Sequence, residues 1–345
     1  MKMEHAKGKP SIEHARTART SHVTHPVLHT ILAHPGLAIG IALVLTFVIV
    51  ALAAPLIAPP QGDDPYKIPK DGLSPMPSPP SPGHPLGTMA YQYDVFYGLV
   101  WGTRVALRIG VIVTLGRMLI GVLLGLLSGY YGGLIDGLLM RLTDAFMAFP
   151  LVAAAMVVLA LYGGALRGIT GMSSPTQAQT VEQGLTLSLI MFGWMQYARL
   201  IRGNVLAERN KEYIGAATAA GVPPRRIVVR HLLPNVTQGL FVLAASDIGA
   251  VVVLVAMFSF IGLTTNTGGV DPAADWGEML SVSRNWVIVA GRNAFKYWFT
   301  YIPPSLAVVL FSMGWNLIGD GLRDILDPRL NGGRIVSKNR NTSVL

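Results

Sequence analysis

Long apolar runs dominate the pattern of hydrophobic and polar positions along the chain. An α-helix that crosses a bilayer needs about 20 mostly apolar residues. Six stretches meet this requirement, at residues 36–58, 105–129, 144–163, 183–203, 238–263 and 299–319. The first stretch has no charge, and its apolar core is longer than that of a removable signal peptide, so we expect a retained anchor. The pattern predicts an all-α integral membrane protein with six transmembrane helices.

The composition supports this prediction. The 345 residues are 51% hydrophobic and only 13% charged, whereas a soluble domain is typically about 25% charged. A soluble globule and a disordered chain are therefore both excluded. The sequence has no cysteine, which rules out disulfides, thiolate metal sites and a catalytic thiol.

The distribution of Lys and Arg predicts the orientation in the membrane. With the N-terminus in the cytoplasm, 18 of these residues fall on the inner side and eight on the outer side. Because positive charge marks the cytoplasmic side, we expect both termini to be cytoplasmic. The formal charge of +9 then reflects topology rather than binding to nucleic acid. The predicted segments are a cytoplasmic tail (1–35), the first helix (36–58), an extracytoplasmic Pro/Gly-rich segment (59–102), a transmembrane domain (103–320) and a second cytoplasmic tail (321–345).

The long inner loop at 204–237 has the most informative sequence. Residues 212–220 are rich in Ala and other good helix formers, and Gly221 suits the left-handed conformation that ends many helices. Pro223 stops that helix, and Pro224 fits the first turn of a second, basic and amphipathic helix. Two interpretations remain open from spacing alone. The loop is either a linker lying on anionic lipid headgroups or a docking element for another protein.

Several motifs, in a consistent order, resemble one family. The loop residues from Glu212 to Ala217, with Gly221 and Arg230 to Asn235, resemble the EAA loop of binding-protein-dependent ABC importer permeases. The resemblance is strongest to the C-type subunit of the dipeptide/oligopeptide/nickel family and covers about 36–330. The other matching segments are His84 to Thr88, Gly132 to Pro150, Tyr197 to Gly203, Ser259 to Leu263, Trp276 to Leu280 and Asn316 to Leu330.

The resemblance implies a fold, a function and a set of partners. It implies the type I ABC importer permease (MetI-like) fold in a bacterial cytoplasmic (inner) membrane, forming half of a path for di- or oligopeptides. Nickel, glutathione or an oligosaccharide are alternative cargoes. The implied partners are a second homologous permease, two ATPase subunits, an extracytoplasmic solute-binding protein and membrane lipid, without nucleic acid. The implied ATPase-coupling residues are Glu212, Ala216, Ala217, Gly221, Arg225, Arg226, Arg230, His231, Pro234 and Asn235, of which the last four brace the second loop helix.

The chain is not expected to be an enzyme. It contains no GxxxxGK[ST] phosphate loop, so ATP and Mg would be bound by the partner ATPase subunits, and we predict no cofactor in this chain. It also lacks the HExxH and GxSxG motifs of a membrane-embedded enzyme. A self-contained secondary transporter would show an internal inverted repeat, and none is recognisable between the first three and last three stretches.

Two charged residues lie at membrane depth, Arg117 and Asp247. Such residues usually face the protein interior or a water-filled cavity. They either line the substrate path or form a structural ion pair, with each other or with the partner subunit, and Arg117 could also snorkel.

The remaining candidate features are histidines and outer aromatics. Six His residues in the N-terminal tail have irregular spacing without clustered acids, which favours a solvated tail over a metal site. We therefore predict no metal site. The outer residues Trp276, Trp286 and Trp298 are expected to anchor the chain at the membrane interface or to contact the binding protein.

Overall fold

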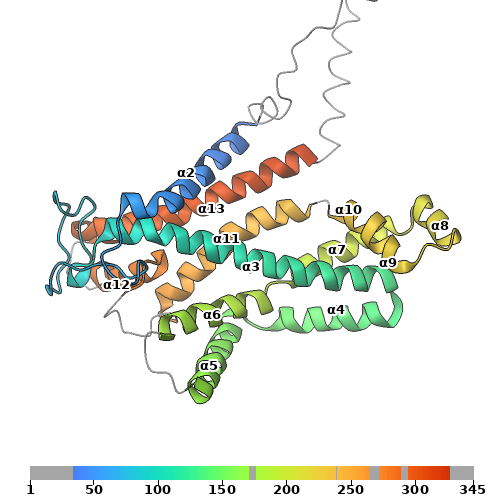
Figure 1. Ribbon diagram of the computed structural model, residues 1–345, viewed down its shortest axis with the longest axis horizontal. Coiled ribbons are helices and arrows are strands. Elements are labelled where there is room, and N and C mark those ends of the chain that lie inside the picture. The colour runs from blue at the N-terminus through green and yellow to red at the C-terminus, as the bar shows by residue number, and fades with distance from the viewer. Residues whose placement is uncertain (1–33, 171–175, 238, 264–271, 289–293, 327–345) are drawn as a thin grey trace, which may run out of the picture.

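The computed structural model describes residues 34–170, 176–237, 239–263, 272–288 and 294–326, and its regular elements there are helices (Figure 1). The N-terminal tail before residue 34, with five of its six histidines, and residues 327–345 lie outside the described residues. The longer helices are α2 (Pro35–Ile57), α3 (Val95–Tyr131), α4 (Gly133–Ala148), α5 (Leu151–Thr170), α6 (Thr176–Met191), α7 (Met195–Glu208), α11 (Leu240–Ile261), α12 (Trp276–Ile288) and α13 (Trp298–Leu326).

Shorter elements complete the described chain. They are η2 (Ala90–Gln92), α8 (Glu212–Ala219), α9 (Pro224–Ile227), the single π-helical turn η3 (Val228–Leu232), α10 (Leu233–Val236) and η4 (Ala294–Tyr297). Four isolated β-bridges among the described residues organise the segment between α2 and α3.

Four helices are long and apolar enough to cross a membrane, namely α2, α3, α11 and α13. The pair α4 and α5 passes the same test only when taken together, and its two helices are bent by 91°. The described chain is therefore an all-helical membrane protein with four or five candidate spans. Six crossings remain a prediction from sequence.

The third and fourth predicted helices are each broken, which corrects the expectation of continuous spans. The helix expected at 144–163 is divided at Phe149, whose extended backbone (ψ 129°) follows from Pro150. Proline disfavours the helical conformation in the residue before it and offers no N–H to continue the ladder. The helix expected at 183–203 is divided between α6 and α7 at residues 192–194.

The second predicted helix is longer than expected. It begins at Val95 rather than near 105, inside the stretch assigned to the Pro/Gly-rich segment. Asp94 fixes this start, because its side chain accepts a hydrogen bond from the Tyr97 backbone N–H at 2.9 Å. The opposite oxygen of Asp94 lies 2.7 Å from Nδ1 of His84. His84 also lies 3.0 Å from Asp71, so this one ring connects the Pro/Gly-rich segment to the first turn of α3.

Helices α3 and α7 approach each other along a stripe of small residues. A Cβ atom placed on Gly121 would lie 2.3 Å from Cβ of Tyr197, and one on Gly125 would lie 2.6 Å from the Ala198 carbonyl oxygen. Gly129 continues the stripe one turn further along. Small residues at every fourth position let two helix backbones touch, which is a common basis of packing in membranes.

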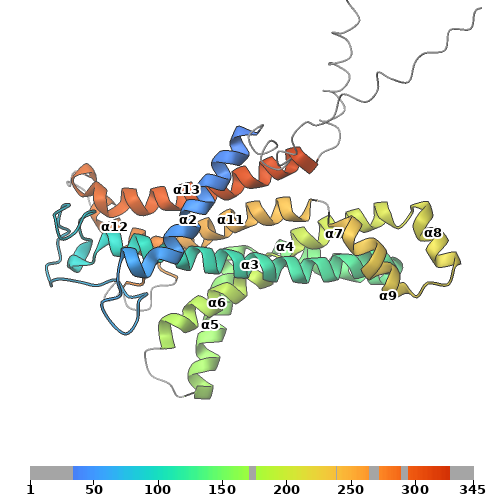
Figure 2. The same ribbon diagram turned by 45° about the horizontal axis from the view of Figure 1, so that its top comes forward.

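Helices α2 and α13 pack antiparallel at the edge of the bundle (Figures 1 and 2). Leu37, near the start of α2, contacts Gly321, near the end of α13. The beginning of α2 and the end of α13 therefore lie on the same side of the bundle, as an even number of crossings requires. Which side faces the cytoplasm stays a prediction.

The end of the bundle beside α12 is an aromatic core. Trp276 is only 2% exposed, and its indole N–H donates to the Leu99 carbonyl at 3.0 Å. The expectation that Trp276 is an interface anchor or a contact for a binding protein is therefore wrong. Trp101 is equally buried and donates to the Ala58 carbonyl at 2.9 Å. One indole therefore joins α3 to the end of α2, and the other joins α3 to the start of α12.

The glycine stripe gives a direct test of the α3–α7 contact. Gly125→Leu should lower the thermal unfolding midpoint of the purified protein, because overpacking typically costs about 1–3 kcal/mol. Gly137→Leu is the matched control, since nothing lies within 4 Å of a Cβ at Gly137. Equal midpoints for the two variants would show that α3 and α7 do not pack this closely.

Candidate functional site

The loop between α7 and α11 folds as two short helices around a glycine turn. Helix α8 starts at Glu212, and Gly221 has the left-handed φ of +75° that ends this part of the loop. Pro224 occupies the first turn of α9, which continues through the π turn into α10. The helix, the left-handed glycine and the N-terminal proline expected from the sequence are all confirmed.

An apolar cluster fixes this loop to the membrane helices. Ile214 from α8, Ile227 from α9 and Leu232 from the π turn are each at most 5% exposed. They pack in one cluster with Val205 of α7 and Leu126 of α3. Because the loop shares a buried core with these helices, it is packed against them and is not a free linker.

A polar network joins the two halves of the loop. Glu208 lies 2.7 Å from Lys211 and accepts a 2.5 Å hydrogen bond from the Tyr213 hydroxyl. Asn235 donates to Tyr213 at 3.2 Å and to the His231 carbonyl at 2.7 Å. The hydrogen bonds from Lys211 and Tyr213 hold the pKa of Glu208 below its usual value, and the bond to Glu208 raises the pKa of Tyr213.

Two of the residues predicted to brace the second loop helix, His231 and Asn235, contact Tyr213 in this network. His231 and Asn235 connect the second loop helix to α8 through Tyr213, rather than to a span. Besides the apolar cluster, a hydrogen bond joins the second loop helix to α7, because Asn204 donates to the Val236 carbonyl at 2.8 Å. Glu208, Tyr213 and Asn204 were not among the predicted site residues. Tyr213 and Asn204 each have a partner more than 20 positions away in the chain, which the sequence does not reveal.

The tip of the loop is an exposed surface, which we call the loop tip. Most of the predicted coupling residues lie there and are exposed, while Ala217 and His231 are partly buried. The exposed set is Glu212, Ala216, Gly221, Arg225, Arg226, Arg230, Pro234 and Asn235. Within the described part of the chain, Arg225, Arg226 and Arg230 have no ion-pair partner, so the loop tip presents positive charge and small side chains together.

Three arginines of α7 connect the base of the loop to α3 and α4. Arg202 makes two hydrogen bonds to Asp136, at 2.5 and 2.6 Å. Arg199 pairs with Asp144 at 2.5 Å. Arg209 donates at 2.8 Å to the Gly129 carbonyl, one of the last in α3. The helix dipole favours the cation Arg209 at the C-terminus of α3 and the anion Asp136 in the first turn of α4.

Arg117 and Asp247 form a buried ion pair in the middle of the bundle. Nη1 of Arg117 lies 2.7 Å from Asp247 Oδ1, and the two side chains are 5% and 14% exposed. The Tyr197 hydroxyl donates to the second oxygen of Asp247 at 3.0 Å. The pair joins α3 to α11. Of the roles considered from the sequence, this is a structural ion pair between the two residues. Arg117 therefore does not snorkel.

The break between α6 and α7 accommodates Arg117. In a continuous helix the Gly193 N–H would donate to the Leu189 carbonyl. Here the Gly193 N–H reaches Ile190 instead, and the Leu189 carbonyl accepts a 2.8 Å hydrogen bond from Nε of Arg117. A Cβ atom on Gly193 would lie 2.0 Å from that Nε, so glycine is required where the guanidinium enters.

This architecture is that of a multi-pass helical membrane protein with a braced loop at one end. Residues 121–332 match the family described as "Binding-protein-dependent transport system inner membrane component". This match covers more than half of the chain, which therefore belongs to that family. It is a non-catalytic, multi-pass inner-membrane component of a transport system whose partners include a solute-binding protein and an ATPase.

Individual relatives extend the similarity over most of the chain. A glutathione transport system permease protein of Pectobacterium atrosepticum is 32% identical over 251 residues, which cover 73% of this chain and 74% of the relative. A dipeptide transport system permease protein of Alkalihalophilus pseudofirmus is 31% identical over 292 residues, or 85% of each chain. The glutathione transport system permease protein of Escherichia coli is 32% identical over 289 residues, covering 84% of this chain and 85% of the relative.

The buried ion pair gives a prediction about stability. Arg117→Met or Asp247→Leu alone should destabilise the protein by about 3–5 kcal/mol, because each leaves one buried charge without its partner. The double variant should recover much of this loss, since no uncompensated charge remains. Thermal unfolding of the three variants against the native protein measures the difference. A double variant no better than the sum of the single ones would contradict a pairwise role.

Proposed function

We propose that the chain is one of two homologous transmembrane subunits of an ATP-driven importer for di- or oligopeptides. The relatives above are described as permeases for dipeptides and for glutathione, itself a small peptide. This supports a peptide cargo over nickel or an oligosaccharide. A solute-binding protein would deliver the cargo to the end of the bundle that carries the Pro/Gly-rich segment.

We further propose that the loop tip docks on the ATPase and couples its cycle to the spans. The observation that carries this proposal is the combination of an exposed loop tip with a buried base. Ile214 and Ile227 share a core with α3 and α7, so a force applied at Ala216 or Arg225 is passed to the membrane helices. With two ATPase subunits, one for each permease, closure of the ATPase pair would move both loops. This arrangement requires cytoplasmic termini.

The competing interpretation is a linker that lies on lipid headgroups. Such a helix would bury a continuous apolar face in the membrane interface. Most apolar residues of the loop instead pack in the protein's own cluster, with Val229 the exposed exception. Helix α8 exposes mainly small residues, together with Glu212 and part of Tyr213. Small side chains offer little area to lipid but let a protein surface approach closely, which supports docking.

The docking proposal is tested by enlarging one small residue of the loop tip. Ala216→Arg should reduce peptide uptake by about tenfold or more, and reduce ATPase activity stimulated by the peptide-loaded binding protein, because the added side chain prevents close contact. Gly221→Pro should do the same, since proline cannot adopt the φ of +75°. Uptake and ATPase activity are measured in proteoliposomes that contain the whole complex.

Ala207→Arg is the matched control for these variants. Ala207 is exposed on α7, outside the loop tip, so the same substitution there should leave uptake near the native level. Co-purification of the ATPase subunits separates failed assembly from failed coupling. Normal uptake by Ala216→Arg and Gly221→Pro in fully assembled complexes would refute docking through the loop tip.

A further inference from the structure

A cavity of about 330 Å³ is lined in part by α12, which lies at the end of the bundle away from α8 and the loop tip (Figure 1). Its walls come from α3, α6, α11 and α12, together with residues 64–67 of the Pro/Gly-rich segment. Small-molecule sites usually occupy about 300–1,000 Å³ and combine apolar walls with a few polar groups. This cavity has both, with Val105, Ile109 and Leu185 beside several charged side chains.

The charges around the cavity are unevenly matched. On the α3–α6 wall, Arg108 pairs with Glu182 at 2.7 Å. On the α12 wall, Asp275 and Glu278 form no ion pair within the described part of the chain. The remaining charged residues, Asp64 and Lys67, come from the exposed Pro/Gly-rich segment, and their charges have opposite signs. The buried α12 wall therefore holds two carboxyl groups that no cation of the described residues pairs with.

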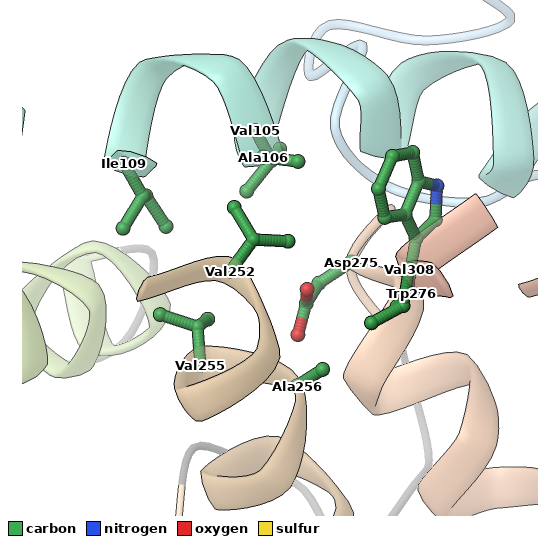
Figure 3. A pocket seen from close by; sticks show the side chains of 9 residues that line it. All are labelled: Val105, Ala106, Ile109, Val252, Val255, Ala256, Asp275, Trp276 and Val308. Atoms are coloured by element: carbon green, nitrogen blue, oxygen red, sulfur yellow. The ribbon is translucent and has the colours of Figure 1, made fainter. Parts of the chain in front are cut away.

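Asp275 has a structural role that accounts for its position. It stands immediately before α12 and accepts hydrogen bonds from the Glu278 N–H at 3.2 Å and from the Ser259 hydroxyl at 2.6 Å. The first is the contact of a helix N-cap, and the second joins the start of α12 to α11. Figure 3 shows its carboxylate pointing into the apolar space between α11 and Trp276, a small hollow next to the main cavity.

A role in capping a helix does not explain why Glu278 is buried. Its side chain is only 7% exposed, and one carboxylate oxygen accepts a 3.1 Å hydrogen bond from the Ala273 N–H. The other oxygen accepts no hydrogen bond from the described residues, and the Glu278 side chain lines the cavity. Burial, and then the nearby charge of Asp275, raise the pKa of Glu278 to about 8. Burial thus disfavours the charged form of Glu278, and a bound cation that donates a hydrogen bond to the free oxygen would favour the ionised carboxylate.

We propose that this cavity binds the protonated amino terminus of the transported peptide, with Glu278 as its anionic ligand. This inference rests on the proposed peptide cargo. An ammonium group carries three donors and one charge, which matches the free oxygen of Glu278 and the field of Asp275. A bound divalent metal is a poorer match, because the described residues contain no group of three or more metal-ligating side chains.

Binding is tested on the assembled permease–ATPase complex with two probes, alanyl-alanine and N-acetyl-alanyl-alanine. Millimolar alanyl-alanine should raise the thermal unfolding midpoint of the complex, because a ligand that binds the folded state stabilises it. The acetylated peptide has no ammonium group and should give no such shift. The native complex alone makes this comparison, so the test does not depend on any variant folding.

Variants then assign the effect to Glu278. Glu278→Gln keeps the shape but removes the charge, so the shift with alanyl-alanine should disappear, and the KM for its uptake should rise about tenfold. Asp63→Asn is the matched control, because Asp63 is an exposed acid at the same end of the bundle and outside the cavity. It should respond as the native complex does.

The outcomes separate this inference from the proposed function. Equal shifts with both peptides, no shift with either, or a native response from Glu278→Gln would each overturn the ammonium site. If the native complex takes up alanyl-alanine in those cases, the peptide-importer proposal still stands. If the native complex with its binding protein takes up no peptide, the proposed cargo itself is wrong, and the site as a peptide site falls with it.

Discussion

The fold depends on how one cation, Arg117, is satisfied inside an apolar bundle. Lipid offers no hydrogen bonds, so every polar group at membrane depth needs a partner within the protein. Arg117 takes the carboxylate of Asp247 on α11 and the carbonyl of Leu189 on α6. Both contacts require the break at residues 192–194, which ends α6 and sets the direction in which α7 leaves. Because α7 leads into the loop, the position of the loop depends on a contact deep in the bundle.

Polar groups of the described chain gather in four places, of which two are satisfied within the protein and two are not. The Arg117 pair is closed, since charge and hydrogen bonds are matched within the bundle. The base of the loop is also closed, through pairs such as Arg202 with Asp136. The loop tip and the cavity beside Glu278 are open, with cations at one end and carboxylates at the other. Incomplete satisfaction thus lies where a partner or a cargo would meet the protein.

Features that depend on local backbone conformation were predicted from the sequence, and features that depend on distant partners were not. The loop was well predicted, because glycine and proline act through their own backbone and need no distant partner. The continuous helix expected at 183–203 was wrong, since its break is caused by Arg117, more than 70 positions earlier in the chain. Trp276 was misplaced for the same reason, because its burial depends on α2, α3 and α13. Glu278 was noted only within a motif, and its burial required the tertiary structure.

The glycine stripe on α3 bears on how the bundle can move. Helices whose backbones touch at Gly121, Gly125 and Gly129 cannot slide or roll without collision, so α3 and α7 behave as a single stiff rod. Helix α3 has 37 residues and is about 55 Å long at 1.5 Å per residue. A small tilt applied beside the loop is therefore magnified into a larger sideways displacement at the far end, where Arg108 and the cavity lie. The packing of these two helices therefore makes α3 a lever arm that carries movement from the loop to the end of the bundle with the cavity.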